Sequence, residues 1–189
     1  MHLSKEVLRE LIEKQALVSN LSDINSQLTA NGVDVRIAGI VEITNGGRLA
    51  INKTDNLAPK LGTGVVLRGF ENRLAAYEIK DLQAVDNGVV KIDRLKPYLV
   101  ITCEEVNTPD NLMFTILPRS SLFRLTQSVL GCGFGEAGYK GFLTFMLLSF
   151  SDAQIELGSR FAQLSFSELK GSAHYEQQNE SSYQGGKLF

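Results

Sequence analysis

A strand-then-turn pattern begins at Val33, where the chain reads Val33-Asp34-Val35-Arg36-Ile37-Ala38-Gly39-Ile40-Val41-Glu42-Ile43 and then Asn45-Gly46-Gly47. Such a run of β-branched residues, ended by turn-forming residues, is typical of a strand that closes in a tight turn. Shorter runs of the same kind follow, at residues 64–67, 74–79, 89–92, 98–103, 113–117, 142–150 and 160–166. Many short strands separated by turn signals predict an all-β chain, folded as a sandwich, jelly roll or barrel.

One amphipathic helix is expected before these strands, over residues 4–16. Ser4 can cap this helix, and Leu8, Leu11 and Ile12 then recur at helical spacing among charged residues. Helix signals fade beyond it. At the other end of the chain, residues 177–189 are polar and glycine-bearing, which is typical of a mobile tail that orders on a ligand.

Composition limits the class of protein. Apolar residues make up 43% and charged residues 21%, as in an ordinary soluble globular chain with a sizeable core. The net charge of −2 gives no general attraction to nucleic acid, and no apolar run is long enough to span a membrane. The N-terminus lacks the apolar segment of a signal peptide, and two cysteines are too few for a disulfide scaffold. We therefore expect a cytoplasmic, reduced protein with no nucleic-acid or membrane partner. We expect one domain, with a helix and connection over 1–20, a β core over 21–170 and a C-terminal tail over 171–189.

Two segments carry the candidate chemistry. Pro118-Arg119-Ser120-Ser121-Leu122 sets an Arg beside two hydroxyls at the end of an apolar run, a combination that can hold a phosphate. A glycine-rich loop follows, Gly131-Cys132-Gly133-Phe134-Gly135-Glu136-Ala137-Gly138-Tyr139-Lys140-Gly141. A carboxylate in such a loop can orient and deprotonate a water. Together the two segments predict a site that holds a polyphosphate and attacks it with water.

Each of these residues also has a simpler interpretation. Arg119-Ser120-Ser121 could be an exposed turn, and Glu136 a solvated loop carboxylate. Tyr139 could be a plain aromatic residue at a strand end rather than a ring that stacks on a sugar. Residues 133–138 match GxGxxG formally, but a strand-like run follows them, whereas a dinucleotide site needs a helix there.

Two polar residues lie inside apolar strand patterns. Gln163 and Asp34 both need partners there, because burying an unpaired amide or carboxylate is costly. Arg160 could be only a surface arginine, and His2 and His174 are given no role. Cys132 is interpreted as a small residue of a tight loop, since no His lies near it in the sequence. Two His and two Cys, widely scattered, do not predict a zinc site.

At five places, in the expected order, the sequence resembles the dUTPase and dCTP deaminase superfamily. Residues 31–37 are similar to its first motif, and residues 118–125 to the phosphate-binding RSSLxRL segment. Residues 133–141 are similar to the third motif, with Glu136 where the family usually has Asp. Residues 158–164 are similar to G(D/E)RxAQL, and residues 174–185 to the C-terminal phosphate lid of the deaminases. The resemblance implies a mainly β, distorted jelly-roll or β-barrel fold of the dUTPase type with an N-terminal helix.

The departures from the family bear on the reaction. The resemblance puts the general acid/base of the deaminases, a Glu, at position 146, where this chain has Met146. A thioether neither accepts nor donates the proton that deamination moves. Glu136 still supplies the carboxylate for triphosphate cleavage. The family's lid lysine falls on Ser182, and Lys187 is near enough in the tail to replace it. This combination resembles the archaeal dUTPase branch of the dCTP deaminase family.

The resemblance therefore implies hydrolysis of dUTP to dUMP and diphosphate, with Glu136 as the catalytic base and Mg²⁺ bound mainly through the substrate phosphates. Asp34 would orient metal-bound water from the outer shell, Gln163 would fix the α-phosphate region, and Tyr139 would stack on the deoxyribose. Phosphate and nucleotide contacts are expected from Arg119, Ser120, Ser121, Arg124, Gly133, Tyr139, Gln163, Tyr183, Gln184 and Lys187. A homotrimer with sites at the subunit interfaces is implied as well.

Three alternatives stay open at this point. The chain could be a dCTP deaminase or a bifunctional dCTP deaminase/dUTPase, a non-catalytic nucleotide-binding regulator with the same fold, or a purely structural β-domain. The preference among dUTP, dCTP and dTTP is also open, because a base read by backbone groups leaves little trace in the side chains.

Overall fold

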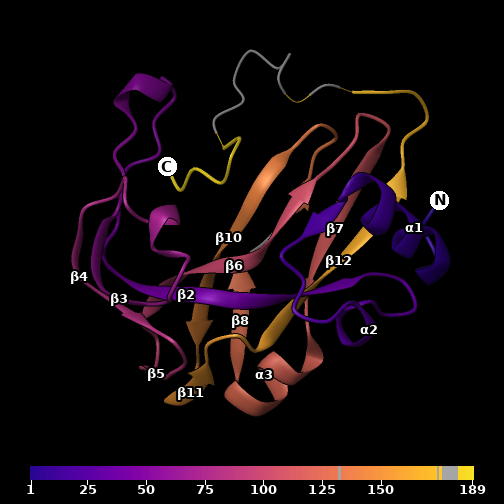
Figure 1. Ribbon diagram of the computed structural model, residues 1–189. Helices are drawn as coiled ribbons and strands as arrows, with labels where there is room; N and C mark the ends of the chain where they lie inside the picture. Colours follow the sequence, from indigo (N-terminus) through magenta and orange to yellow (C-terminus); the bar gives the residue numbers. More distant parts are fainter. Residues whose placement is uncertain (132, 174, 176–182) are drawn as a thin grey trace.

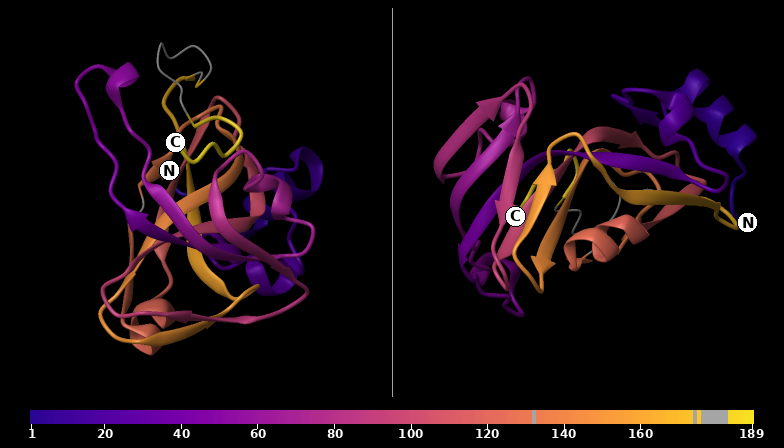
Figure 2. Two further views of the ribbon diagram at one scale, coloured as in Figure 1. Left: turned by 90° about the vertical axis from the view of Figure 1, so that its left-hand side faces the viewer. Right: turned by 90° about the horizontal axis from the view of Figure 1, so that it is seen from below.

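The computed structural model describes residues 1–131, 133–173, 175 and 183–189, and most of them belong to a strongly curved β-sheet (Figures 1 and 2). The strands are β1 (Val18–Ser19), β2 (Val33–Asn45), β3 (Lys60–Leu67), β4 (Ile79–Val85), β5 (Val89–Ile92), β6 (Pro97–Asn107), β7 (Leu112–Pro118), β8 (Ser128–Gly131), β9 (Phe134–Gly135), β10 (Lys140–Ser149), β11 (Ala153–Glu156) and β12 (Arg160–Glu168). The helices are α1 (Lys5–Gln15), α2 (Ile24–Gln27) and α3 (Ser120–Thr126), with the 3₁₀ turns η1 (Lys53–Asp55) and η2 (Glu71–Arg73). The mainly β fold is thus confirmed.

The long strand β2 joins the two halves of the sheet. Its first residues pair with β12 and its later residues with β6 and β3, all antiparallel. The main path of the sheet runs β8-β10-β6-β2-β12-β7-β9. Figure 2 shows that the sheet, with β2 near its middle, is strongly curved. A twisted sheet of many strands approaches a barrel in this way. The strand expected from Val33 onward is therefore present, and it connects the two halves of the sheet.

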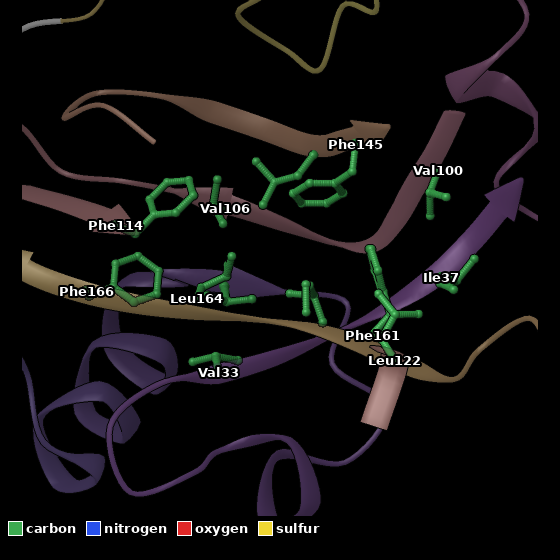
Figure 3. Packing of buried hydrophobic residues seen from close by; sticks show 14 of the residues in the cluster. Val33, Ile37, Val100, Val106, Phe114, Leu122, Phe145, Phe161, Leu164 and Phe166 are labelled. Carbon is green, nitrogen blue, oxygen red and sulfur yellow. The ribbon is translucent and has the colours of Figure 1, made fainter. Parts of the chain in front are cut away.

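The main hydrophobic core is enclosed by the curved sheet (Figure 3). Phe114 packs beside Phe166 and Phe145 beside Phe161, and the ring centroids in each pair are 5.3 Å apart. Leu122 of α3 reaches into the same core. Each large apolar side chain that is buried in this way contributes about 1.5–3 kcal/mol. The core therefore fixes β12, which carries the candidate residue Gln163, and β7, which the candidate residue Arg119 follows.

The N-terminal helix is confirmed and differs from its expected bounds by one residue at each end. Ala16 ends it in the left-handed conformation, with its N–H donated to the carbonyl of Ile12. Leu8 is fully buried against the core, whereas the charged residues face solvent. None of the helices in the described part of the chain is long and apolar enough to cross a membrane.

Two local expectations were wrong. The strand expected at residues 74–79 is a turn up to Tyr77, and β4 starts only at Ile79. Leu74 is buried there because the turn folds over a second apolar cluster, not because it alternates along a strand. The helix α3 was not expected, since seven residues give too few repeats for helical periodicity to stand out.

Candidate active site

Residues of three segments that are far apart in the sequence meet at Asp34. Gln163 of β12 pairs with Asp34 of β2 in register, and its Nε2 donates to Asp34 Oδ1 at 3.2 Å and to Thr29 Oγ1 at 2.9 Å. Arg119 Nε lies 3.1 Å and Arg160 Nη1 lies 3.4 Å from Asp34 Oδ2. The sequence predicted that Asp34 and Gln163 both need partners, and they contact each other. Arg119 and Arg160 complete the set, and we call these four residues the Asp34 group.

Burial sets the electrostatics of the Asp34 group. The Asp34 side chain is 3% exposed, whereas the Arg119 and Arg160 side chains are 31% and 36% exposed. Burial raises the pKa of the Asp34 carboxyl, and Arg119, Gln163 and Arg160 oppose this shift. Of the alternatives for Arg160, the plain surface arginine does not hold, because its guanidinium pairs with Asp34. No local pattern signalled this contact, because residues three apart on a regular strand face opposite sides. The β12–β2 pairing has a register shift between Arg160 and Ala162, which the sequence does not reveal.

The segment that the sequence predicts to hold a phosphate lies at the junction of β7 and α3. Arg119 precedes the helix, its backbone N–H donates to the carbonyl of Phe161 at 2.9 Å, and Nη1 donates to the carbonyl of Arg160 at 3.3 Å. Ser120 is exposed and Ser121 is half-buried in the first turn of α3. Arg124 is exposed, with its guanidinium 5.7 Å from the centroid of the Phe123 ring. Arg119 thus belongs to the Asp34 group, and the two hydroxyls adjoin it in sequence.

Glu136 lies elsewhere, in the wall of a cavity of about 420 Å³ that we call the Glu136 cavity. The short strand β9 pairs with β7 and leads directly into Glu136, which is half-buried. Gly138 has a φ of +83°, and the Tyr139 N–H donates to the carbonyl of Glu136 at 3.2 Å, so the loop between β9 and β10 turns tightly here. The cavity is lined by Phe114, Ile116, Gly133, Phe134, Gly135, Glu136, Tyr139, Leu143, Thr144, Tyr175, Tyr183 and Leu188.

Tyr139 lines this cavity with a ring that is already packed. It meets Tyr175 edge to face, with ring centroids 5.7 Å apart, and its hydroxyl donates to the carbonyl of Phe142 at 2.7 Å. Burial raises the pKa of the Tyr139 phenol well above its usual range, so the hydroxyl stays a donor. Tyr175 was not singled out from the sequence, because nothing in a polar tail marks one tyrosine as a buried residue.

The tail was expected to be mobile, but its described residues pack against the body. Leu188 is buried in the second apolar cluster, and its N–H donates to the hydroxyl of Tyr77 at 2.8 Å. The side chain of Gln184 bonds to the backbone at the start of β10 and in the loop before it, accepting from Lys140 N–H at 3.1 Å and donating to the carbonyl of Gly138 at 3.3 Å. Tyr183 lines the Glu136 cavity, whereas Lys187 is exposed. The expectations for Cys132, His174 and Ser182 lie outside the described residues.

Met146 has an exposed side chain on β10. It pairs with Leu99 of β6 and with Gly131 of β8, and its side chain is 47% exposed. It stands two residues after Thr144, which lines the Glu136 cavity.

Among the described residues, few side chains are placed to bind a metal ion directly when no substrate is bound. They contain no group of three or more His, Cys, Asp or Glu side chains placed to hold one. Both oxygens of Asp34 already accept from Arg119, Arg160 or Gln163. These residues fit a metal that is held mainly by substrate phosphates better than a site built from protein ligands alone.

Comparison with known proteins identifies the family. The model of the dCTP deaminase-like family matches residues 2–169. A dCTP deaminase of Thermococcus kodakarensis is 35% identical over 111 residues, which cover 57% of this chain and 69% of the relative. A probable deoxyuridine 5′-triphosphate nucleotidohydrolase of Methanosarcina acetivorans is 29% identical over 167 residues, which cover 87% and 86%.

The fold also resembles a solved structure. The crystal structure of the 2′-deoxycytidine 5′-triphosphate deaminase from Agrobacterium tumefaciens has a TM-score of 0.59 and 17% sequence identity to this chain. The match covers 89% of this chain and 48% of that deaminase, so this chain spans about half its length. At this identity the likeness concerns the fold alone. From the curled sheet, the ordered motifs and the family match, we conclude that the chain belongs to the dCTP deaminase-like family.

Proposed function

We propose that this protein hydrolyses dUTP to dUMP and diphosphate. The observation that carries the proposal is the position of Glu136, a half-buried carboxylate in the wall of an otherwise mainly apolar cavity. A carboxylate held in this way can accept a proton from water next to a bound nucleotide. Relatives named as dCTP deaminases and as probable dUTP nucleotidohydrolases are both similar to this chain, so the choice between them rests on the site.

In the proposed reaction, Glu136 takes a proton from a water whose oxygen attacks the α-phosphorus. The bond between the α-phosphorus and the oxygen that bridges to the β-phosphorus breaks, and diphosphate leaves. Charge on the leaving group would be neutralised by a Mg²⁺ ion held mainly by the three phosphates and water. A role for Asp34 as an outer-shell partner of that metal stays a prediction. Its carboxylate oxygens already contact Arg119 and Gln163, so Asp34 would act on the metal only through a water.

The phosphates would be held by Arg119 with Ser120 and Ser121. The contact with Asp34 holds the Arg119 guanidinium in place before a substrate arrives, and this reduces the entropy that binding costs. Gln163 is tied to the same carboxylate and to Thr29. Arg124, Lys187 and the tail residues Tyr183 and Gln184 stay predicted nucleotide contacts.

Deamination of dCTP is the second candidate, since relatives carry that name. It requires a group that moves protons at the pyrimidine ring, and the family resemblance puts that group at position 146. Met146 has no such group. We therefore propose that deamination is absent.

A homotrimer with shared sites completes this proposal. The Asp34 group and the Glu136 cavity are separated within one chain, because β12 and β9 lie on either side of β7, about 10 Å apart at the usual strand spacing. Large exposed apolar side chains occur on β7, α3, β8, β9 and β10, at Leu117, Phe123, Leu125, Val129, Phe134 and Met146. Exposed apolar side chains in such number are typical of surfaces that other chains cover. A neighbouring subunit would then bring Arg119 to the Glu136 cavity.

The test is the isosteric variant Glu136→Gln, assayed for diphosphate release from dUTP. We expect a loss of at least about 100-fold in turnover, the usual contribution of a general base, with nucleotide binding retained. Glu168→Gln changes an exposed carboxylate at the end of β12 and is the matched control, expected to leave turnover unchanged. Unchanged diphosphate release by Glu136→Gln would remove the proposed base, and ammonia release from dCTP by the wild type would favour the deaminase instead.

A further inference from the structure

An irregularity in the β10–β6 pairing shapes one wall of the Glu136 cavity. Phe142 pairs with Glu105 and Thr144 with Ile101, so β6 advances four residues while β10 advances two. The Leu143 N–H therefore donates to the side chain of Thr102, at 2.9 Å from Oγ1, instead of to a β6 carbonyl. Neighbouring residues of a regular strand face opposite sides of the sheet. Here both Leu143 and Thr144 line the cavity, which the register shift makes possible.

The other polar side chains of the cavity are already engaged or have another task. The Tyr139 hydroxyl donates to the carbonyl of Phe142, and the Tyr175 hydroxyl accepts from Tyr183 N–H at 3.3 Å. Tyr183 is 55% exposed, and Glu136 is the proposed base. No hydrogen bond within the described part of the chain engages the hydroxyl of Thr144. Among the described lining residues, Thr144 is therefore a neutral, half-buried side chain whose hydroxyl has a free donor and acceptor.

The remaining lining side chains are Phe114, Ile116, Phe134, Leu143 and Leu188, all of them apolar. A pyrimidine has apolar faces and a polar edge, so it needs apolar walls and a hydrogen-bond partner at one side. A hydroxyl serves both as donor and as acceptor, and it can pair with a ring carbonyl or a ring amino group.

We propose that the Thr144 hydroxyl binds the polar edge of the pyrimidine base, and this inference rests on the proposed function. Thr144 is then a base-binding residue that the motifs of the sequence did not single out. Its contribution is to the affinity for the nucleoside part of the ligand, separate from the phosphate grip of Arg119.

The experiment compares wild type, Thr144→Val and Thr144→Ser by calorimetric titration with dUMP and with inorganic tripolyphosphate. Valine keeps the volume and removes the hydroxyl. We expect its Kd for dUMP to rise about 3- to 10-fold, the usual effect of one lost neutral hydrogen bond, with the Kd for tripolyphosphate unchanged. Thr144→Ser restores the hydroxyl and should bind dUMP within about twofold of wild type. Thr54→Val, on an exposed turn remote from the cavity lining, is the matched control.

The outcomes separate this inference from the proposed function. Thr144→Val that binds dUMP like wild type, or that loses dUMP and tripolyphosphate alike, would overturn the role of Thr144. A wild type that binds dUMP but releases no diphosphate from dUTP would overturn the proposed reaction and leave the Thr144 comparison valid. A wild type that binds neither probe would overturn both.

Discussion

Asp34 is a buried carboxylate that contacts three polar side chains. Arg119 and Arg160 share its Oδ2, and Gln163 donates to its Oδ1. The raised pKa of Asp34 means that its ionised form is less favourable in the folded chain than in water, because desolvation outweighs the attraction of its partners. A charge kept at a cost in stability is typical of a functional position. We therefore expect Asp34 to matter more for activity than for folding.

The substitution Asp34→Asn tests this expectation. It removes the charge at nearly constant volume, so the desolvation cost and the ion pairs disappear together. At pH 7 we expect the loss of unfolding free energy in urea to stay below about 3–5 kcal/mol, the loss that is usual when one partner of a buried ion pair is removed, because the Arg119 and Arg160 side chains that lose their partner are about one third exposed and stay solvated. The KM for dUTP should rise about tenfold, since Arg119 loses a charge-assisted hydrogen bond worth about 1.5–3 kcal/mol. A variant with wild-type KM and much lower stability would make Asp34 a purely structural residue.

Wild type and Asp34→Asn should also differ in how their stability depends on pH. Because the folded state raises the pKa of Asp34, its stabilising contribution is present below the ordinary value of 3.8 and is lost as the pH rises through the folded-state value. The unfolding free energy of wild type minus that of Asp34→Asn should therefore fall across this window. A difference that rises with pH would mean that the ion pairs dominate over burial.

The partners of Asp34 illustrate what a sequence leaves open at the scale of single residues. Asp34 and Gln163 stood out because each interrupts an apolar strand pattern, and this indicated that both need partners. Their mutual contact depends on the register of β2 against β12, across more than 120 residues, which no local pattern encodes. Thr144 carried no signal at all, since only the shifted β10–β6 register turns it to the cavity.

At the scale of elements, the pairing of β9 with β7 positions Glu136. Gly135 faces Phe114 across this pair, and a Cβ at Gly135 would overlap the Phe114 ring. The ring therefore packs over a residue without a side chain, which lets the glycine-rich loop approach the core. The direction in which the chain enters Glu136 depends on this close approach.

The variant Gly135→Ala should lower the free energy of unfolding by about 1–3 kcal/mol, the usual cost of overpacking. It should also lower turnover, because the loop that carries Glu136 directly after β9 must shift. Phe114→Leu in the same chain should recover part of the loss, and a double-mutant cycle in urea would measure this coupling. Gly46→Ala, where an added Cβ meets nothing within 4 Å, is the matched control. Additive effects of the two substitutions would contradict the close approach.

The elements with the longest local periodicity were the most directly predictable from the sequence. The helix α1 and the strand β2 each carry a repeated pattern over ten or more residues, and both are confirmed. The turn at Leu74–Tyr77 and the short helix α3 have no such repeat, and tertiary packing determines their form. The tail is a similar case, since the packing of Leu188 and Tyr175 against the body outweighs the polar composition around them.

At the scale of the whole molecule, the two parts of the proposed site lie in different places of the single chain. Arg119 belongs to the Asp34 group, and Glu136 lines a cavity on the far side of β7. A base that activates water at the α-phosphorus must lie within a few ångströms of the phosphates that Arg119 would grip. Association of identical chains meets this demand, because a rotation between subunits can bring one half-site to the other. We expect a particle of three times the 20.8 kDa chain mass in light scattering.

Mixed trimers test whether the site is shared. Arg119→Ala and Glu136→Gln should each be inactive alone, because each loses one half of every site. When the two variants are unfolded, mixed in equal amounts and refolded, random assembly joins an intact Glu136 to a neighbour's intact Arg119 at about one quarter of the interfaces. Diphosphate release from dUTP should therefore recover to about one quarter of the wild-type rate per site. Each variant refolded by itself is the control, and it should stay inactive. If both halves came from the same chain, no mixture could regain activity, because every subunit would carry one defective half.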